Sequence, residues 1–208
     1  MNIEIDNTVV KVQHQNVADL FHMVSYERRA FWIKWRGVLV WKYPTDLFNY
    51  AELIQTLLPD YLIETGTAEG GAALFYADIM DLVGHGEVIT IDPYYKPVYK
   101  HPRVTHIGKD SIEAIGELPV GKRTIVSLDA SHLKDDVLRE MYAYAPIVGN
   151  GMYMVVEDTD MSGHPVRWSE GDGPWEAVEE FNDDRFIEDK GLATRYLFSA
   201  HTWLRKNE

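Results

Sequence analysis

Glu64-Thr65-Gly66-Thr67-Ala68-Glu69-Gly70-Gly71 is a glycine-rich turn between a short apolar run, residues 61–63, and a helical pattern over residues 71–83. Glycine lets the backbone of such a strand-to-helix turn come close to a ligand. A plain tight turn is the simpler interpretation of the same residues. The surrounding sequence decides between the two.

Apolar segments of strand length alternate with helical patterns on both sides of this turn. Such alternation is typical of an α/β fold with a mostly parallel sheet and helices on both faces. The pattern predicts helices over residues 16–35, 46–58, 71–83, 110–118, 133–145 and 174–182, and strands over residues 61–63, 88–91, 103–107, 124–128, 152–156, 186–187 and 196–199.

A length of 208 residues suits one domain with a short extension. We expect a helical N-terminal extension or cap over residues 1–45 and the main domain over residues 46–208. The net charge of −13 argues against nucleic acid and anionic membranes as partners. Without cysteine there are neither disulfides nor thiolate zinc sites. The first 12 residues resemble no signal peptide, so we expect a cytoplasmic protein.

Acidic residues follow four of the predicted strands, namely Glu64, Asp92, Asp129 and Glu157. Ligands of parallel sheets bind at the carboxyl ends of the strands. Four acidic groups at that edge therefore predict a site for cations or hydroxyl groups.

The charge of the turn distinguishes two classes of cofactor. Gly66, Ala68 and Gly71 nearly match the dinucleotide fingerprint, but a pyrophosphate there would meet the carboxylates of Glu64 and Glu69 without any Lys or Arg in the turn. S-adenosylmethionine carries a sulfonium and an ammonium, and no phosphate. We therefore predict that S-adenosylmethionine binds at the acidic strand ends, with Asp92 accepting hydrogen bonds from its ribose. The residues predicted to bind this cofactor are Glu64, Gly66, Thr67, Ala68, Gly70, Gly71, Asp92, Asp110, Ser111 and Asp129. For Asp110 and Ser111, the capping of a helix is an equal alternative.

The carboxylates of Asp129, Glu157 and Asp158 are predicted to lie together at neighbouring strand ends. Close carboxylates repel one another unless a cation intervenes, and Mg²⁺ prefers oxygen ligands. Helix capping or contacts with backbone amides are the alternative roles. His132 follows Asp129 by three residues, and its unperturbed pKa of about 6.5 suits a general base. His164, in the long loop after Glu157, is a weaker candidate for a substrate contact.

Several segments together resemble the cephalosporin hydroxylase and rhamnosyl O-methyltransferase family over about residues 32–182. The late Gly-Pro-Trp-Glu-Ala-Val and the Glu-Asp-Thr elements are the most specific. The matching segments are Trp35-Arg36-Gly37, Lys42-Tyr43-Pro44-Thr45-Asp46, Ile63-Glu64-Thr65-Gly66, Gly70-Gly71-Ala72-Ala73-Leu74, Ser127-Leu128-Asp129-Ala130-Ser131-His132, Val137-Leu138-Arg139-Glu140, Val156-Glu157-Asp158-Thr159, Gly163-His164-Pro165-Val166 and Gly173-Pro174-Trp175-Glu176-Ala177-Val178.

This resemblance implies a Rossmann-like class I methyltransferase fold with a seven-stranded sheet, S-adenosylmethionine, and Mg²⁺ held by Asp129, Glu157 and Asp158. The layout is also similar to catechol-type O-methyltransferases, in which a catalytic lysine stands at the position of His132. We expect methyl transfer to a hydroxyl of a small molecule, a sugar or a glycosylated natural product. His132 would remove the proton, and Lys42 would reach the cofactor carboxylate or the substrate, unless it is a surface lysine.

Two other functions remain open at this point. The chain could serve an oxygenation pathway, as the family name suggests, or be a non-catalytic S-adenosylmethionine-binding module. A third alternative, a nicotinamide enzyme, is disfavoured because the turn is acidic. The aromatic N-terminal segment favours a homo-oligomer. Four tryptophans are candidates for covering the site or an interface, with core packing as the ordinary role of each, namely Trp35, Trp41, Trp168 and Trp175.

Overall fold

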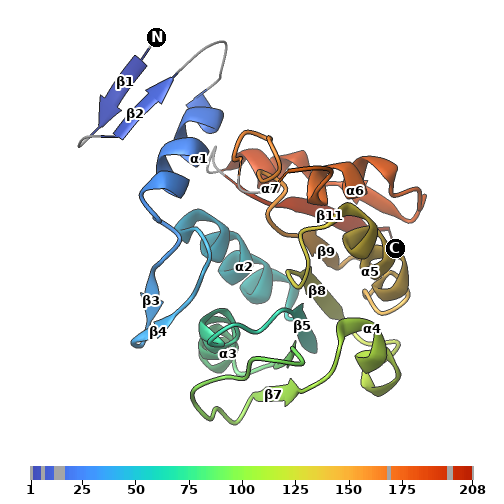
Figure 1. Ribbon diagram of the computed structural model, residues 1–208. Coiled ribbons are helices and arrows are strands. Elements are labelled where there is room, and N and C mark those ends of the chain that lie inside the picture. Colours follow the sequence, from blue (N-terminus) through green and yellow to red (C-terminus); the bar gives the residue numbers. More distant parts are fainter. Residues whose placement is uncertain (1, 6–7, 12–16, 168–169, 196–198, 208) are drawn as a thin grey trace.

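The protein is described by a computed structural model over residues 2–5, 8–11, 17–167, 170–195 and 199–207. Seven strands form the central sheet, namely β5 (Tyr61–Thr65), β6 (Glu87–Ile91), β7 (Val104–Ile107), β8 (Thr124–Leu128), β9 (Tyr153–Val156), β10 (Phe186–Glu188) and β11 (Thr202–Lys206). Their order is β10-β11-β9-β8-β5-β6-β7 (Figure 1). Strands β9, β8, β5, β6 and β7 run parallel to one another, and β11 pairs antiparallel with both of its neighbours, β9 and β10.

Helices cover both faces of this sheet. They are α2 (Pro44–Leu57), α3 (Gly71–Val83), α4 (Ser111–Ala114), α5 (Lys134–Tyr144), α6 (Pro174–Glu180) and α7 (Lys190–Arg195). Figure 1 shows α2 and α3 on one side of the sheet and α4 and α5 on the other. The predicted fold class is confirmed. Among the residues described, no helix combines the length and apolar character that crossing a membrane requires.

The N-terminal segment differs from the predicted helical extension. It contains two hairpins, β1 (Asn2–Ile5) with β2 (Thr8–Lys11) and β3 (Lys34–Trp35) with β4 (Val38–Leu39), and between them the helix α1 (Val17–Glu27). The prediction of one helix over residues 16–35 is therefore wrong beyond Glu27. Arg29, two residues after α1, adopts a left-handed conformation at φ 54° that is incompatible with continuing the helix.

The predicted strand over residues 196–199 lies largely outside the described residues, as does Trp168. The last strand of the sheet is instead β11, five residues that pair with β9. Its position is supported by burial, since Trp203 is completely buried.

The register of the parallel strands brings the acidic strand ends together. Thr65 of β5 lies opposite Ile91 of β6 and Leu128 of β8, and Leu128 lies opposite Val156 of β9. The residues that follow these four strand ends therefore meet at one edge of the sheet. These strands are almost wholly buried, as strands of a parallel sheet covered on both faces should be.

The glycines of the turn are packed against the protein's own backbone. A Cβ at Gly71 would lie 2.1 Å from the carbonyl oxygen of Leu39, and a Cβ at Gly66 would lie 2.3 Å from that of Asp129. Gly66 also has φ +84°, which favours glycine. At both positions the close neighbour is the backbone of another segment, β4 at Gly71 and the residue after β8 at Gly66. That these glycines also admit a ligand stays a prediction.

Gly71→Ala is expected to destabilise the fold by about 1–3 kcal/mol, because β4 and α3 must move apart to admit the methyl group. Urea unfolding would measure the loss. Gly116→Ala is the matched control, since a Cβ there meets nothing within 4 Å. Equal stability of the two variants would contradict the close packing of β4 on the turn.

Glu140 is a buried acid in the middle of α5. It is 3% exposed, and its Oε2 has no hydrogen-bond partner among the residues described. Burial raises the pKa of Glu140 to about 7, although a hydrogen bond with Ser111 opposes this. The native state therefore holds a proton that the unfolded state releases at lower pH, and stability falls as pH rises through this interval.

Glu140→Gln should remove that pH dependence because the amide does not ionise. Relative to the natural protein, we expect the variant to gain about 2 kcal/mol at pH 8 and nothing at pH 4.5. Urea midpoints at both pH values would test this, with exposed Glu113→Gln as the control. A gain of the same size at both pH values would argue against ionisation as its cause.

Candidate functional site

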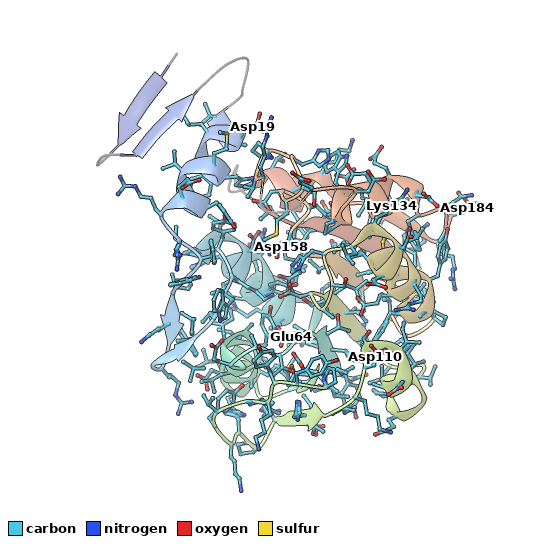
Figure 2. The ribbon with its side chains drawn as sticks, viewed as in Figure 1. Asp19, Glu64, Asp110, Lys134, Asp158 and Asp184 are labelled. Carbon is cyan, nitrogen blue, oxygen red and sulfur yellow. The ribbon has the colours of Figure 1, made fainter. Side chains whose placement is uncertain are left out.

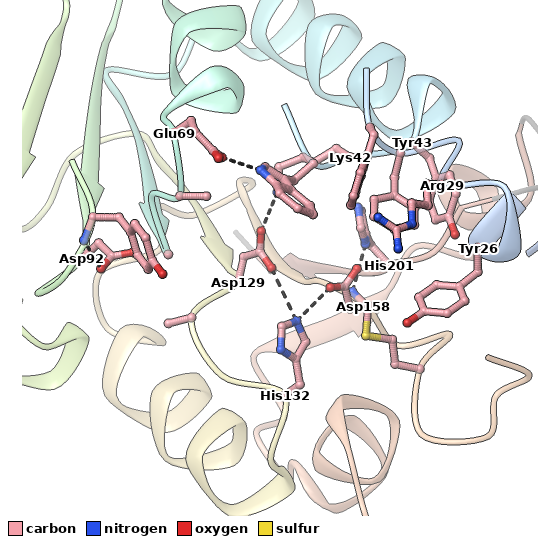
Figure 3. Close-up of a pocket in the computed structure, with 18 of the residues that line it drawn as sticks. Tyr26, Arg29, Lys42, Tyr43, Glu69, Asp92, Asp129, His132, Asp158 and His201 are labelled. Atoms are coloured by element: carbon pink, nitrogen blue, oxygen red, sulfur yellow. Dashed lines mark hydrogen bonds and ion pairs between the residues drawn. The ribbon is translucent and has the colours of Figure 1, made fainter. Parts of the chain in front are cut away.

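A cavity of about 680 Å³ opens at the carboxyl edge of the sheet. Its size lies within the range typical of small-molecule sites. Figure 3 shows Asp92 and Glu69 at one end, Tyr26, Arg29 and Tyr43 at the other, and Asp129, His132 and Asp158 between them. The predicted site residues that line this cavity are Lys42, Gly66, Ala68, Asp92, Asp129, His132 and Asp158.

The centre of the cavity is a group of two carboxylates and one imidazole. His132 Nε2 lies 2.8 Å from Asp158 Oδ2 and 3.9 Å from Asp129 Oδ1, and one ligand atom of each residue lies within 4.8 Å of the others. Burial lowers the pKa of His132, but the hydrogen bond with Asp158 and the nearby carboxylates outweigh it and raise the pKa to about 9. These contacts favour the protonated form of the imidazole.

Lys42 is buried behind this group instead of being a surface residue. Its side chain is 1% exposed, and Nζ donates to Asp129 Oδ2 at 2.9 Å and to Glu157 Oε2, with Glu64 Oε1 at 4.0 Å. Burial lowers the pKa of Lys42, yet the charges of Asp129 and Glu157 raise it well above its usual value. The ammonium thus binds protein carboxylates, and its predicted contact with cofactor or substrate stays a prediction.

Glu157, a member of the predicted metal set, is not part of the Asp129, His132 and Asp158 group, because protein groups bind both of its oxygens. Its Oε1 accepts hydrogen bonds from Tyr50 Oη at 2.6 Å and from Ser127 Oγ at 2.5 Å, and its Oε2 is bound by Lys42. Burial raises the pKa of Glu157, but Lys42 and His201 outweigh it and hold the pKa below its usual value. Glu157 is therefore an ionised carboxylate already satisfied by the protein. Its predicted place in the metal set requires Lys42 to move.

The first end of the cavity is built around Asp92. Its Oδ2 accepts from the Thr67 amide at 3.0 Å, and its Oδ1 accepts from the amides of Tyr94 and Tyr95. A carboxylate has about four acceptor sites, so about one remains for a ligand hydroxyl. Glu69 lines the same end, whereas Glu64 is 1% exposed and lies behind the wall. Of the two turn carboxylates in the charge argument, only Glu69 faces the cavity.

Several predicted binding residues lie outside the cavity wall, and each has another contact. Asp110 caps α4 by accepting from Ile112 N at 2.9 Å, which agrees with the capping alternative, and it lies apart from Asp158 (Figure 2). His164 bonds Glu176 at 2.6 Å and stacks on Trp175. The other predicted residues that do not line the cavity are Glu64, Thr67, Gly70, Gly71, Ser111 and Glu157.

Sequence reasoning missed His201, which lies just before β11. Its Nδ1 accepts the backbone N–H of Asp158 at 3.1 Å, and its Nε2 lies 3.4 Å from Asp46 Oδ2 and 3.3 Å from Glu157 Oε2. Asp158 has φ 57°, a strained conformation for a non-glycine residue. His201 therefore holds the backbone that aims Asp158 at His132. No local signal marks this isolated histidine, because its partners come from α2 and the end of β9.

The other missed residues come from the N-terminal segment. Eight residues from this segment line the cavity, and five of them are aromatic: Tyr26, Phe31, Trp32, Trp41 and Tyr43. The density of aromatic residues over 26–43 was the available signal. The turn between α1 and β3 and the residues after β4 bring them to the sheet edge.

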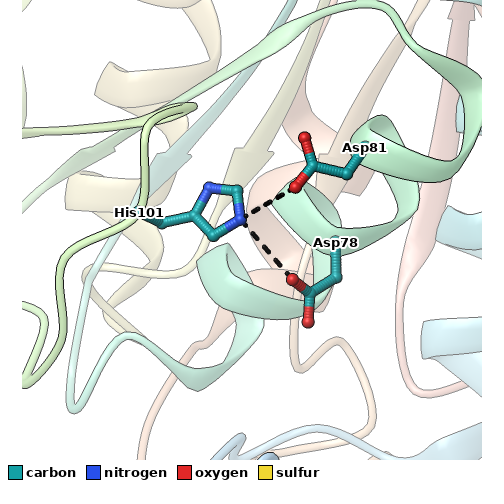
Figure 4. A group of neighbouring side chains, drawn as sticks. All are labelled: Asp78, Asp81 and His101. Carbon is teal, nitrogen blue, oxygen red and sulfur yellow. Dashed lines mark ion pairs between the residues drawn. The ribbon is translucent and has the colours of Figure 1, made fainter.

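A second group of potential metal ligands, Asp78, Asp81 and His101, lies on α3 and the loop after β6 (Figure 4). Here the carboxylates already pair with Arg36 and Arg103. His101 Nδ1 accepts the Arg103 N–H, so the ring proton is on Nε2 and points toward both aspartates. This group fastens the loop and the β3–β4 hairpin to α3.

The family model for rhamnosyl O-methyltransferase/CmcI matches residues 28–207. The chain belongs to this family. The rhamnosyl O-methyltransferase of Mycobacterium bovis (strain BCG / Pasteur 1173P2) is 34% identical over 182 residues, covering 81% of this chain and 74% of that protein. The predicted family and enzyme class, an S-adenosylmethionine-dependent O-methyltransferase, are thereby confirmed.

Solved structures of CmcI share the fold of this chain. The apo structure matches with a TM-score of 0.67 and 21% identity, covering 85% of this chain and 76% of CmcI. CmcI with Mg and S-adenosylmethionine matches with a TM-score of 0.65 and 19% identity, covering 85% and 77%. The fold of this chain is therefore that of known class I methyltransferases, as predicted.

Lys42→Met is expected to destabilise the protein by about 3 kcal/mol, because it leaves the buried Glu157 and its neighbours without a compensating charge. Adding Glu157→Gln in the same chain should recover part of the loss. Urea unfolding of both single variants and of the double variant would measure the coupling. A Lys42→Met protein as stable as the natural one would show that the ammonium is not needed to balance these carboxylates.

Proposed function

We propose that this protein transfers a methyl group from S-adenosylmethionine to a hydroxyl of a sugar or glycosylated small molecule, with Mg²⁺ at the site. The observation that carries the proposal is the group Asp129, His132 and Asp158 at the centre of one cavity, between an acidic cofactor turn and an aromatic acceptor end. The relatives named rhamnosyl O-methyltransferase support a sugar as the acceptor.

The donor set fits a divalent cation. Asp129 and Asp158 offer carboxylate oxygens, the ligands that Mg²⁺ prefers, and both are about one-fifth exposed to the cavity. We propose these two as holders of the ion, with Glu157 joining them when Lys42 releases it. The CmcI structure with Mg and S-adenosylmethionine supports this choice of metal. When bound, the ion supplies positive charge that favours ionisation of a nearby hydroxyl group.

The chain's own residues position the two reactants. Asp92 offers its remaining acceptor site to the ribose hydroxyls, and Glu69 provides negative charge for the cationic end of the cofactor. His132 is the group placed to accept the proton of the acceptor hydroxyl. Its ring must first be neutral, and added positive charge between Asp129 and Asp158 would lower its pKa toward that state. Bringing methyl group and hydroxyl into line accounts for much of the rate gain.

The oxygenation alternative has less support. The group at the centre of the cavity contains one imidazole and two carboxylates, whereas the common iron(II) oxygenase site uses two imidazoles and one carboxylate. The predicted homo-oligomer and the predicted cytoplasmic location stay predictions.

Calorimetric titration with S-adenosylmethionine, with and without Mg²⁺, tests the proposal together with methyl-transfer assays on a rhamnoside. We expect binding by the natural protein, and a loss of Mg²⁺-dependent transfer of at least about a hundredfold in Asp129→Ala. Asp135→Ala, an exposed acid in the first turn of α5, is the control and should keep full activity.

Absence of cofactor binding under both conditions would refute the enzyme proposal. Mg²⁺-dependent transfer that survives Asp129→Ala would show that the metal lies elsewhere.

A further inference from the structure

An aromatic wall lines the cavity from the side away from Asp92, at Tyr26 and Tyr43, to the contact of Trp41 with Glu69. The wall is defined as Tyr26, Phe31, Trp32, Trp41 and Tyr43. Figure 3 shows Tyr26 and Tyr43 across the Asp129–His132–Asp158 group from Asp92. All five side chains come from residues 26–43, the last turn of α1 and the segment that leads to α2. The wall is therefore contributed by one stretch of chain and faces the group proposed for chemistry.

The rings of the wall contact one another in an unbroken series. Phe31 is at its centre, with ring centroids 5.8 Å from Tyr26, 6.2 Å from Trp41 and 5.8 Å from Tyr43. Trp32 packs edge-on against Trp41 at 5.3 Å. Such contacts hold each ring in place before any ligand arrives.

Two of these rings are unusually exposed for residues held so firmly. Trp32 is 43% exposed and Trp41 is 40% exposed. The indole N–H of Trp41 donates to Glu69, and the guanidinium of Arg29 lies 4.1 Å from the ring centroid of Trp32. Arg29 and Trp41 also have positive φ, at 54° and 63°, which is rare for bulky residues. Strained residues and ordered, exposed rings are typical of binding surfaces.

We propose that this aromatic wall is the acceptor site and that it binds the pyranose ring of a sugar by stacking on Trp32 and Trp41. This inference rests on the proposed function and adds the residues that select the acceptor. One face of a pyranose presents C–H groups, which pack on aromatic rings, while its hydroxyls point outward. Arg29 and Glu27, which line the same end of the cavity, offer a donor and an acceptor for those hydroxyls.

The position of the wall supports a sugar here over the cofactor. Adenine also stacks on aromatic rings, but Asp92, the group suited to the ribose, lies across the Asp129–His132–Asp158 group from Tyr26 and Tyr43 of the wall. A sugar stacked on Trp41 would lie between the wall and the Asp129 group. One hydroxyl would then face His132.

Calorimetry with methyl α-L-rhamnopyranoside in the presence of saturating S-adenosylhomocysteine tests the wall without any reaction. Trp32→Ala and Trp41→Ala should each weaken sugar binding about fivefold or more, because each removes one stacking face. Binding of S-adenosylhomocysteine alone should change less than twofold. Circular dichroism melting would confirm that the variants are folded.

Trp175→Ala is the matched control. Trp175 is 42% exposed, as the wall tryptophans are, but it stacks on His164 outside the cavity. Its loss should leave both affinities unchanged. Trp41→Phe keeps a stacking face and should recover most of the sugar affinity lost in Trp41→Ala.

Three results would overturn the assignment. The first is unchanged sugar affinity in both alanine variants. The second is a loss of S-adenosylhomocysteine affinity in these variants that matches their loss of sugar affinity. The third is a lower molecular mass of the variants than of the natural protein in sedimentation, which would make the wall a subunit interface. The outcome is separable from the proposed function. Sugar binding through the wall without methyl transfer would refute only the proposed reaction. Methyl transfer by the natural protein, with an unaltered KM for the sugar in both alanine variants, would refute only the assignment of the wall as the acceptor site.

Discussion

The site depends on one buried cation, the ammonium of Lys42 among Glu64, Asp129 and Glu157. Three carboxylates at adjoining strand ends would repel one another at this depth, and burial without a partner charge is costly. Lys42 follows the β3–β4 hairpin, so balancing the charge also fixes the N-terminal segment to the sheet. Three features go together with the buried position of Lys42, namely the aromatic wall, the close approach of β4 to Gly71 and the orientation of Asp129.

Much of the fold could be predicted because its signals are local. Central strands buried on both faces are mostly apolar, and proline or glycine marks several helix ends. The acidic strand ends could be predicted too, because parallel strands ending at one edge place the next residues side by side. The predicted helix over residues 16–35 was wrong beyond Glu27 because the apolar spacing there serves tertiary contacts. Trp35, for example, donates to Asp78 and packs on Phe75.

The finer geometry of the site could not be predicted from spacing. Glu157 and Asp158 are neighbours in sequence, yet one carboxylate binds Lys42 and the other His132, because Asp158 takes a left-handed backbone conformation. That conformation is held by His201, over forty residues away in the chain. A predicted boundary at residue 45 also separates Lys42 and the wall from Asp129. In the structure both sides of that boundary line one cavity.

The hydrogen bond from Trp41 to Glu69 joins the two ends of the cavity. Trp41 belongs to the proposed acceptor site, and Glu69 belongs to the glycine-rich turn proposed to bind the cofactor. A molecule that shifts either side chain therefore alters the surface offered to the other molecule. Thermodynamic linkage makes such an effect reciprocal. If the first ligand changes the affinity for the second by some factor, the second ligand changes the affinity for the first by the same factor. One contact between two side chains thus gives coupling between the two ligands a structural basis.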